Sequence, residues 1–192
     1  MDIIDKKLKI ILGSQSPRRE ELLRGLDADF EIRVANIEED FPSNLPIPEI
    51  AEYIANKKLA ALKKSSHPNE LIICSDTIVV LNNEILGKPS NRNEAEEMLN
   101  KLSGKEHTVI SGVAMGDSNK HVAFSDETKV TFKPLSQNEI DYYLDNYEPY
   151  DKAGSYGVQE WIGMMGITKM EGSYFTVMGL PVHLVYGELK NW

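Results

Sequence analysis

The sequence predicts an α/β protein built on a mixed, twisted β-sheet with flanking helices, and three observations lead to this fold class. Short apolar runs rich in β-branched residues alternate with segments of helical periodicity. Two long β-like runs also follow each other directly, which breaks the strict alternation expected of an all-parallel sheet. Finally, the chain has 192 residues and is 41% hydrophobic, so it is long enough to bury a substantial core.

The N-terminal part is expected to form a strand, a tight loop and two helices. The apolar run Leu8–Leu12 predicts a buried strand. Ser16 is expected to cap the following helix, with Pro17 at its first position. A second helix is predicted over Pro48–Lys63, with Tyr53 on its buried face.

The rest of the chain predicts two pairs of strand segments and three more helices. The strand segments are Leu71–Cys74, Ile78–Leu81 after it and before a turn at Asn82 and Asn83, and an antiparallel pair over His107–Met115 and His121–Thr131. The helices are expected from Asn91 to about Leu102, from the Ser136/Glu139 capping box to about Asn146, and from Pro181 onward.

Charge and cysteine content exclude several functions. With 30 acidic and 21 basic residues the net charge is −9, which disfavours broad binding to nucleic acid or to anionic membranes. The single cysteine, Cys74, has no disulfide partner, and neither a signal pattern nor a run of about 18 apolar residues is present. A soluble protein of the cytoplasm is therefore expected.

Several common motifs are missing from the sequence. It contains no G-x-x-x-x-G-K-[ST], no G-x-S-x-G and no G-x-G-x-x-G. The four histidines are scattered without metal-ligand spacing, so we expect no structural zinc site and assign each histidine to the surface or to packing.

The segment "GSQSPRRE" predicts an anion site at the start of the first helix. Free backbone N–H groups, the hydroxyls of Ser14 and Ser16, and the side chains of Arg18 and Arg19 all belong to one turn. The alternative is that Ser16 only caps the helix and the arginines pair with nearby acidic residues such as Glu20.

Asp76 is the second candidate. It lies between the apolar runs "LIIC" and "IVVL" and is expected to be largely buried, so its carboxylate must be hydrogen-bonded, ion-paired or bound to a metal. A purely structural aspartate, satisfied by its neighbours, is the alternative.

The third candidate is the segment "EPYDKAGSYGVQ". Gly154 and Gly157 permit a close approach of the backbone to a ligand or sharp turns, while Lys152 and Gln159 offer a charge and an amide. The alternative is an ordinary polar surface loop.

Together, "LGSQSPRREELL", "SDTIVVLNNEILGKP", "NYEPYDKAGSYGVQ" and "GSYFTVMGLP" resemble the Maf nucleoside triphosphate pyrophosphatases, in the same order and over nearly the whole chain. The resemblance implies a single domain over residues 1–192, an inosine-triphosphatase-like fold with two lobes around a cleft, and possibly a homodimer. It implies hydrolysis of a nucleoside triphosphate to the monophosphate and pyrophosphate with a divalent metal. Within the family, "DKAGSYGVQ" is similar to the subgroup that acts on dTTP and UTP.

The resemblance also assigns roles to individual residues. It implies that Asp76 is the general base and that Arg18, Thr77 and Gln159 discriminate the substrate. Other pocket positions implied by the resemblance are Ser14, Arg19, Glu39, Lys58 and Lys88. Gln15 departs from the family, which commonly has a small residue there, so its effect on the phosphate loop is open.

This chemistry agrees with what triphosphate cleavage requires. Cations must offset charge on the phosphate oxygens, and a carboxylate must orient or deprotonate water. The cationic candidates are Arg18, Arg19, Lys58, Lys88 and Lys152. Glu39 and Asp76 are the candidate ligands for Mg²⁺, or for Mn²⁺, since such cations take one or two carboxylates together with substrate phosphates.

Two other functions stay open at this point. One is a nucleotide-binding regulator of cell division without catalysis, which would need neither Asp76 nor a metal. The other is a pyrophosphatase that removes modified purine nucleotides. Both differ from the first hypothesis in the products released from a nucleotide panel.

Overall fold

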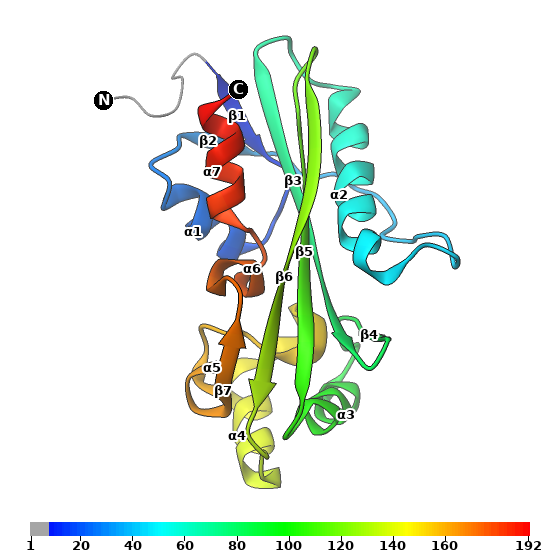
Figure 1. Ribbon diagram of the computed structural model, residues 1–192, viewed down its shortest axis with the longest axis vertical. Coiled ribbons are helices and arrows are strands. Elements are labelled where there is room, and N and C mark those ends of the chain that lie inside the picture. The colour runs from blue at the N-terminus through cyan, green and yellow to red at the C-terminus, as the bar shows by residue number, and fades with distance from the viewer. Residues whose placement is uncertain (1–7) are drawn as a thin grey trace. The chain divides into compact units, whose positions relative to one another are not determined.

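The computed structural model describes residues 8–192, which fold into two compact units (Figure 1). Unit 1 contains the chain up to Asp76, Ser111–Asp126 and Gly179–Trp192, and unit 2 contains Thr77–Ile110 and Glu127–Met178. The helices of unit 1 are α1 (Pro17–Arg24), α2 (Ile47–Lys63) and α7 (Val182–Lys190). Those of unit 2 are α3 (Arg92–Leu102), α4 (Gln137–Tyr147), α5 (Trp161–Gly166) and α6 (Tyr174–Met178), with 3-10 turns η1 (Pro149–Asp151) and η2 (Ala153–Ser155).

The strands form one mixed sheet with the order β2-β1-β3-β5-β6-β7, and β4 pairs with β3. They are β1 (Lys9–Leu12), β2 (Phe30–Ile32), β3 (Glu70–Leu81), β4 (Glu84–Leu86), β5 (Glu106–Gly116), β6 (His121–Phe132) and β7 (Ile167–Glu171). β1 is parallel to both β2 and β3, whereas β4 and β7 are antiparallel to their neighbours. The predicted mixed α/β sheet is therefore confirmed.

In unit 1, helices cover both faces of the parallel strands. Side chains of α2 pack against Ile11, Ile72 and Cys74, while Ile10 and Leu12 alternate to the opposite face of β1 and are also buried. Figure 1 shows α2 and α7 on opposite sides of β3 and β5. This two-sided burial explains why these strands are nearly continuous apolar runs.

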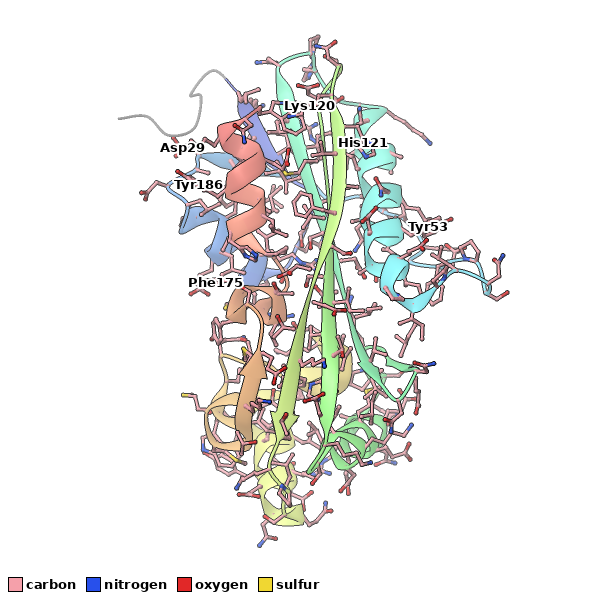
Figure 2. The ribbon with its side chains drawn as sticks, in the orientation of Figure 1. Asp29, Tyr53, Lys120, His121, Phe175 and Tyr186 are labelled. Atoms are coloured by element: carbon pink, nitrogen blue, oxygen red, sulfur yellow. The ribbon has the colours of Figure 1, made fainter. Side chains whose placement is uncertain are left out.

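Tyr53 does not lie on the buried face of α2 as predicted. Its ring is half-buried, and Figure 2 shows it on the outer side of the helix, where the Lys57 ammonium lies 5.9 Å from the ring centroid. The buried stripe instead includes Lys58, which is only 8% exposed. His121, also labelled in Figure 2, is exposed, and its Nε2 forms a hydrogen bond with Asn56 Oδ1 of α2 at 2.8 Å, a surface position as expected.

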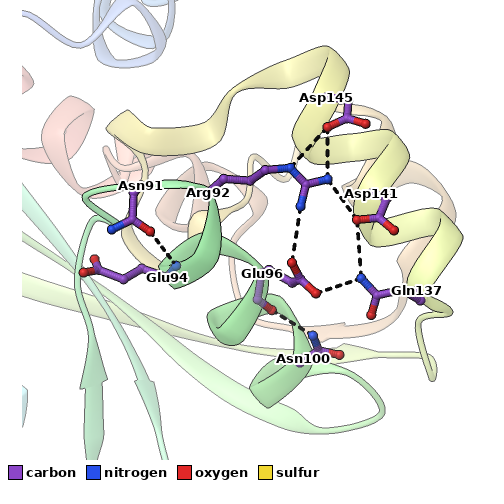
Figure 3. Close-up of polar contacts among 8 residues, drawn as sticks. All are labelled: Asn91, Arg92, Glu94, Glu96, Asn100, Gln137, Asp141 and Asp145. Carbon is purple, nitrogen blue, oxygen red and sulfur yellow. Dashed lines mark hydrogen bonds and ion pairs between the residues drawn. The ribbon is translucent and has the colours of Figure 1, made fainter.

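In unit 2, the predicted helix starts are confirmed at α3 and α4. Asn91 Oδ1 accepts a hydrogen bond from the Glu94 N–H, and Ser136 and Glu139 form the complete capping box. Figure 3 shows how the two helices are linked: the Arg92 guanidinium bonds Glu96 of its own helix and both Asp141 and Asp145 of α4.

The structure differs from the predicted elements in several respects, since it also contains β4, α5 and α6, which were not predicted. The two predicted strand segments before Asn82 are one continuous strand, β3, because Ser75, Asp76 and Thr77 continue the ladder with their polar groups satisfied. The short edge strands β2 and β7 were not predicted. Their exposed, mixed sequences lack the apolar alternation that marks a half-buried strand.

Candidate functional site

The loop between β1 and α1 is tied to the segment before α7. Arg19 Nε donates to the Gly179 carbonyl at 2.8 Å, and its Nη1 lies 3.4 Å from Ser14 Oγ. Ser75 Oγ donates to the same carbonyl at 2.9 Å. Gly179 has a φ of 109°, which a residue with a side chain rarely adopts, so glycine is suited to this position.

Lys58 joins two carboxylates in the same unit. Its Nζ lies 2.6 Å from Asp76 Oδ1 and 2.7 Å from Glu39 Oε1. The side chains of Lys58 and Asp76 are each 11% exposed, so this is a largely desolvated ion pair, whereas Glu39 is 42% exposed. The buried carboxylate expected from the sequence is thus ion-paired rather than satisfied only by its sequence neighbours.

Arg19 lies within the electrostatic reach of this cluster. Burial lowers the pKa of its guanidinium, the neighbouring Asp76 and Glu39 carboxylates oppose that shift, and Arg18 adds to it. An arginine stays charged under such conditions. Arg18, Arg19 and Asp76 are therefore gathered in one region of unit 1, and a phosphate there would meet fixed positive charge beside carboxylates.

The prediction that Ser16 caps α1 through its side chain is wrong. Ser16 occupies the N-cap position with Pro17 following, but its side chain makes no capping hydrogen bond. Instead its N–H donates to Ser14 Oγ at 3.1 Å. This hydrogen bond holds Ser14 and Ser16 close together in the loop before α1. Glu20 pairs with Arg24 at 2.8 Å, one helical turn further on.

The donor set of unit 1 fits a hard divalent cation. Glu39 and Asp76 present carboxylate oxygens to a single cationic atom, Lys58 Nζ, so they converge on one point. Among residues 8–192 no group of three or more His, Cys, Asp or Glu could hold a metal by itself. Two carboxylates completed by substrate phosphates are the arrangement that Mg²⁺ commonly takes.

In unit 2, the predicted Gly-rich segment lies beside the segment that carries Lys88. The Gly154 N–H donates to the Gly87 carbonyl at 3.0 Å, and Gly154 has a φ of 69° with Val79 only 3.0 Å from the position of a Cβ. Glycine is therefore favoured at position 154 by its positive φ and its close packing against the Val79 side chain, while the predicted approach to a ligand stays a prediction. Thr77 stands in β3 directly after Asp76.

Lys152 and Gln159 lie in the same unit. Lys152 is 7% exposed, and its Nζ contacts Asp151 at 2.7 Å and Glu160 at 3.1 Å. The Oε1 atom of Gln159 is buried and has no hydrogen-bond partner within the described part of the chain. An amide oxygen left in that state is suited to a ligand that donates a hydrogen bond.

Three contributors to these clusters were missed by the sequence reasoning: Ser75, Gly179 and Glu160. For Gly179 the signal was its place in "MGLP", a glycine before a helix start. Lys58 was found only through the resemblance, although it follows Ile54 by four residues and so lies on the apolar stripe of its helix. A lysine on such a stripe is a signal in itself, because burial requires it to be paired.

The fold defines the class of this protein first. Over 95% of this chain and 98% of the other, the structure is similar to that of the Staphylococcus aureus Ham1 protein, with a TM-score of 0.51 and 14% sequence identity. The chain is thus a mixed α/β protein of the Ham1 fold.

Sequence comparison gives the family. The family model described as "Maf-like protein" matches residues 9–192, and the chain belongs to the Maf family. It is 53% identical over 187 residues to a dTTP/UTP pyrophosphatase of Phocaeicola vulgatus, covering 97% of each protein. It is 50% identical over 190 residues to a protein of the same name from Porphyromonas gingivalis W83, covering 97% of this chain and 96% of the relative. A third, from Flavobacterium psychrophilum, is 52% identical over 183 residues, 95% of this chain and 94% of the relative.

Proposed function

We propose that this chain is a nucleoside triphosphate pyrophosphatase that hydrolyses dTTP and UTP to the nucleoside monophosphate and pyrophosphate. The observation that carries the proposal is the buried Asp76 carboxylate, held by Lys58 beside Glu39 and Arg19, in a chain about half identical to proteins named for this activity. A carboxylate held in place next to cations is suited to act as the general base that deprotonates a water molecule attacking a phosphorus atom.

The phosphate end of the substrate is assigned to cationic and hydroxyl groups. Arg19 and Lys58 offset charge that develops on the phosphate oxygens, and Asp76 accepts the proton of the attacking water. Further residues proposed to contact the substrate are Ser14, Ser16, Arg18, Lys88 and Lys152.

The base end is assigned to Gln159, with Thr77 and Arg18 contributing to discrimination. The imide edge of thymine or uracil offers one N–H donor between two carbonyl acceptors. The unpartnered Oε1 of Gln159 can accept from that N–H, while its amide nitrogen can donate to a carbonyl. Purines present a different edge and a larger ring to the same group.

We propose Mg²⁺, or Mn²⁺ in its place, as the cofactor, held by Glu39 and Asp76. When bound, such an ion polarises phosphate oxygens and activates water.

No helix in the described part of the chain is long and apolar enough to cross a membrane. The remaining parts of the proposal are a single functional domain over 1–192, a cytoplasmic location and a possible homodimer.

A nucleotide panel tests the function directly. Purified protein is incubated with dTTP, UTP, the purine triphosphates and modified purine triphosphates, with and without Mg²⁺, and the monophosphate and pyrophosphate are quantified. The expected result is Mg²⁺-dependent release of pyrophosphate that is fastest from dTTP and UTP. Binding without product would instead identify a regulator, and faster hydrolysis of modified purines would overturn the pyrimidine assignment.

Asp76→Asn tests the catalytic assignment. The amide keeps the shape of the side chain but removes the charge and the base, so we expect the variant to fold and its kcat to fall by about 10²–10⁴-fold. Circular dichroism checks the fold and pyrophosphate release gives the rate. Turnover near the wild-type rate would remove Asp76 from the mechanism.

A further inference from the structure

Tyr143 links helix α4 to the segment that precedes α5. Its ring is fully buried, and its hydroxyl both donates to Glu160 Oε2 and accepts from the Gly157 N–H at 3.1 Å. Burial, together with the hydrogen bond to the Glu160 carboxylate, raises the pKa of Tyr143, so the phenol stays protonated and remains a donor. One hydroxyl thus fixes the two residues that flank the stretch Val158–Gln159.

Glu160 continues this network to Lys152. Its Oε1 lies 3.1 Å from Lys152 Nζ, and its backbone N–H donates to the Gly157 carbonyl at 3.0 Å, closing a turn around Gln159. The side chain of Glu160 fills the space where a Cβ at residue 157 would lie, 2.7 Å from Cδ. Lys152 uses two of its three N–H groups on Asp151 and Glu160, which leaves one for another acceptor.

These contacts fix the residues on either side of Gln159, a candidate base-reading residue whose acceptor has no partner in residues 8–192. Gln159 lies in the chain between Gly157 and Glu160, the two residues that the Tyr143 hydroxyl contacts, and its buried Oε1 makes no hydrogen bond within the described residues. An amide discriminates between base edges best when its orientation is fixed before the base binds. A mobile amide can reorient to suit other edges, and it loses conformational entropy when the base binds.

We propose that Tyr143 and Glu160 are positioning residues that set substrate specificity: they hold Gln159 and Lys152 in place so that the amide recognises one class of base edge. Glu160 contacts Lys152 directly, and Tyr143 acts through Glu160 and the Gly157 backbone, next to Gln159 in the chain. The inference rests on the proposed function, in which Gln159 reads the pyrimidine edge.

The test compares Tyr143→Phe with Tyr147→Phe. Phenylalanine keeps the buried ring and removes only the hydroxyl on which Glu160 and Gly157 converge. Tyr147 lies one turn further along α4, with its ring stacked on Tyr143 at 5.1 Å between centroids, so the same change there serves as the matched control. For each protein, kcat and KM are measured with dTTP and dGTP, and thermal unfolding is recorded.

For Tyr143→Phe, the expected result is a roughly tenfold loss of the dTTP over dGTP ratio in kcat/KM, mainly through a higher KM for dTTP. Tyr147→Phe should keep the wild-type ratio. Glu160→Gln, which retains a hydrogen-bonding oxygen, should lose less of the ratio than Glu160→Ala.

The two proposals fail in different ways. If the wild-type protein shows no preference for dTTP, the proposed function itself is wrong. If the wild-type preference is present but Tyr143→Phe keeps it, or lowers activity on both nucleotides equally while the melting temperature falls, the positioning role is overturned and Tyr143 is a structural residue.

Discussion

At the scale of single residues, Lys58 connects the candidate catalytic and metal-binding carboxylates of unit 1. A lysine on the buried stripe of a helix loses hydration, and its ammonium must be compensated by opposite charge. Asp76 and Glu39 supply that charge. The Lys58 ammonium in turn neutralises these two carboxylates, which are the candidate metal ligands. A divalent cation approaching these carboxylates therefore competes with the ammonium.

Lys58→Met tests this competition. Removing the ammonium while keeping an apolar stem should raise the affinity of the nucleotide-free protein for Mn²⁺ by about tenfold, because two carboxylates lose their bound positive charge. The same variant should lose about 10²-fold in kcat/KM, since it removes a cation that we propose to lie near the phosphates. Mn²⁺ binding is measured by titration calorimetry.

The control for this variant is Lys57→Met, at the next position of α2. It makes the same change in charge, but Lys57 pairs with Asp40 and is not a candidate site residue. Unchanged Mn²⁺ affinity in Lys58→Met, or an equal gain in Lys57→Met, would contradict the competition.

His107 is a second residue whose state depends on its surroundings. Burial lowers the pKa of this imidazole to about 4, and its Nε2 lies 2.8 Å from the Tyr156 hydroxyl. Because the folded-state pKa lies below the ordinary value near 6.5, the unfolded chain binds the extra proton first as pH falls. Stability from the neutral histidine is present above about pH 6.5 and is lost as pH falls toward 4.

His107→Gln should remove that part of the pH dependence. Between pH 7.5 and pH 5 the wild-type protein is expected to lose about 2 kcal/mol more unfolding free energy than the variant. Urea unfolding at both pH values gives the difference. Parallel losses in the two proteins would show that His107 does not titrate on unfolding as its burial implies.

At the scale of elements, α3 and α4 are joined by charge as well as by packing. Arg92, near the start of α3, reaches two carboxylates of α4 and one of its own helix, and Gln137 closes the group by bonding Glu96 (Figure 3). These pairs raise the pKa of the Arg92 guanidinium. A network with one cation among three carboxylates depends on that cation, because the acids repel one another without it.

Arg92→Gln should therefore lower the melting temperature by about 3 °C at low salt. In 1 M NaCl, where charges are screened within about 3 Å, most of the difference should disappear. Arg24→Gln is the control, since Arg24 makes an exposed ion pair with Glu20 and a contact with the Phe30 ring but joins no network of three carboxylates, so it should change the melting temperature less. A salt-independent loss in Arg92→Gln would point to packing rather than charge.

At the scale of the whole molecule, neither compact unit is a continuous piece of chain. Unit 1 is assembled from three segments and unit 2 from two, and strands β3, β5 and β6 each contribute residues to both. The core of unit 1 accordingly includes Ala114 from the second segment and Leu180 and Val185 from the third.

A fragment of residues 1–76 is predicted to remain unfolded. It carries β1, α1, β2, α2 and β3 up to Asp76, but lacks the strand and helix segments that supply those core residues. Circular dichroism of the fragment and the chemical-shift dispersion of its amide protons, measured by NMR, check this. A fragment with cooperative unfolding would show that α2 and the parallel strands form a sufficient core by themselves.

The sequence alone determined the local features of this protein. Proline and capping residues placed the starts of α1, α3 and α4, apolar runs gave β1 and most of β3, and a buried carboxylate was predicted at Asp76 from its flanking residues. These signals are local because propensity, capping and periodicity act over a few neighbouring residues. The resemblance to a family also came from sequence motifs alone.

Only the tertiary structure decided which groups meet. The pairing of Lys58 with Asp76 joins residues 18 positions apart, and Ser75 meets the Gly179 carbonyl across 104 positions. The Tyr143 hydroxyl, on α4, contacts Gly157 and Glu160, which lie on either side of Gln159 in the chain. Such contacts depend on how helices and strands pack, and a packing arrangement is set by the burial of all apolar faces together, which no short stretch of sequence specifies.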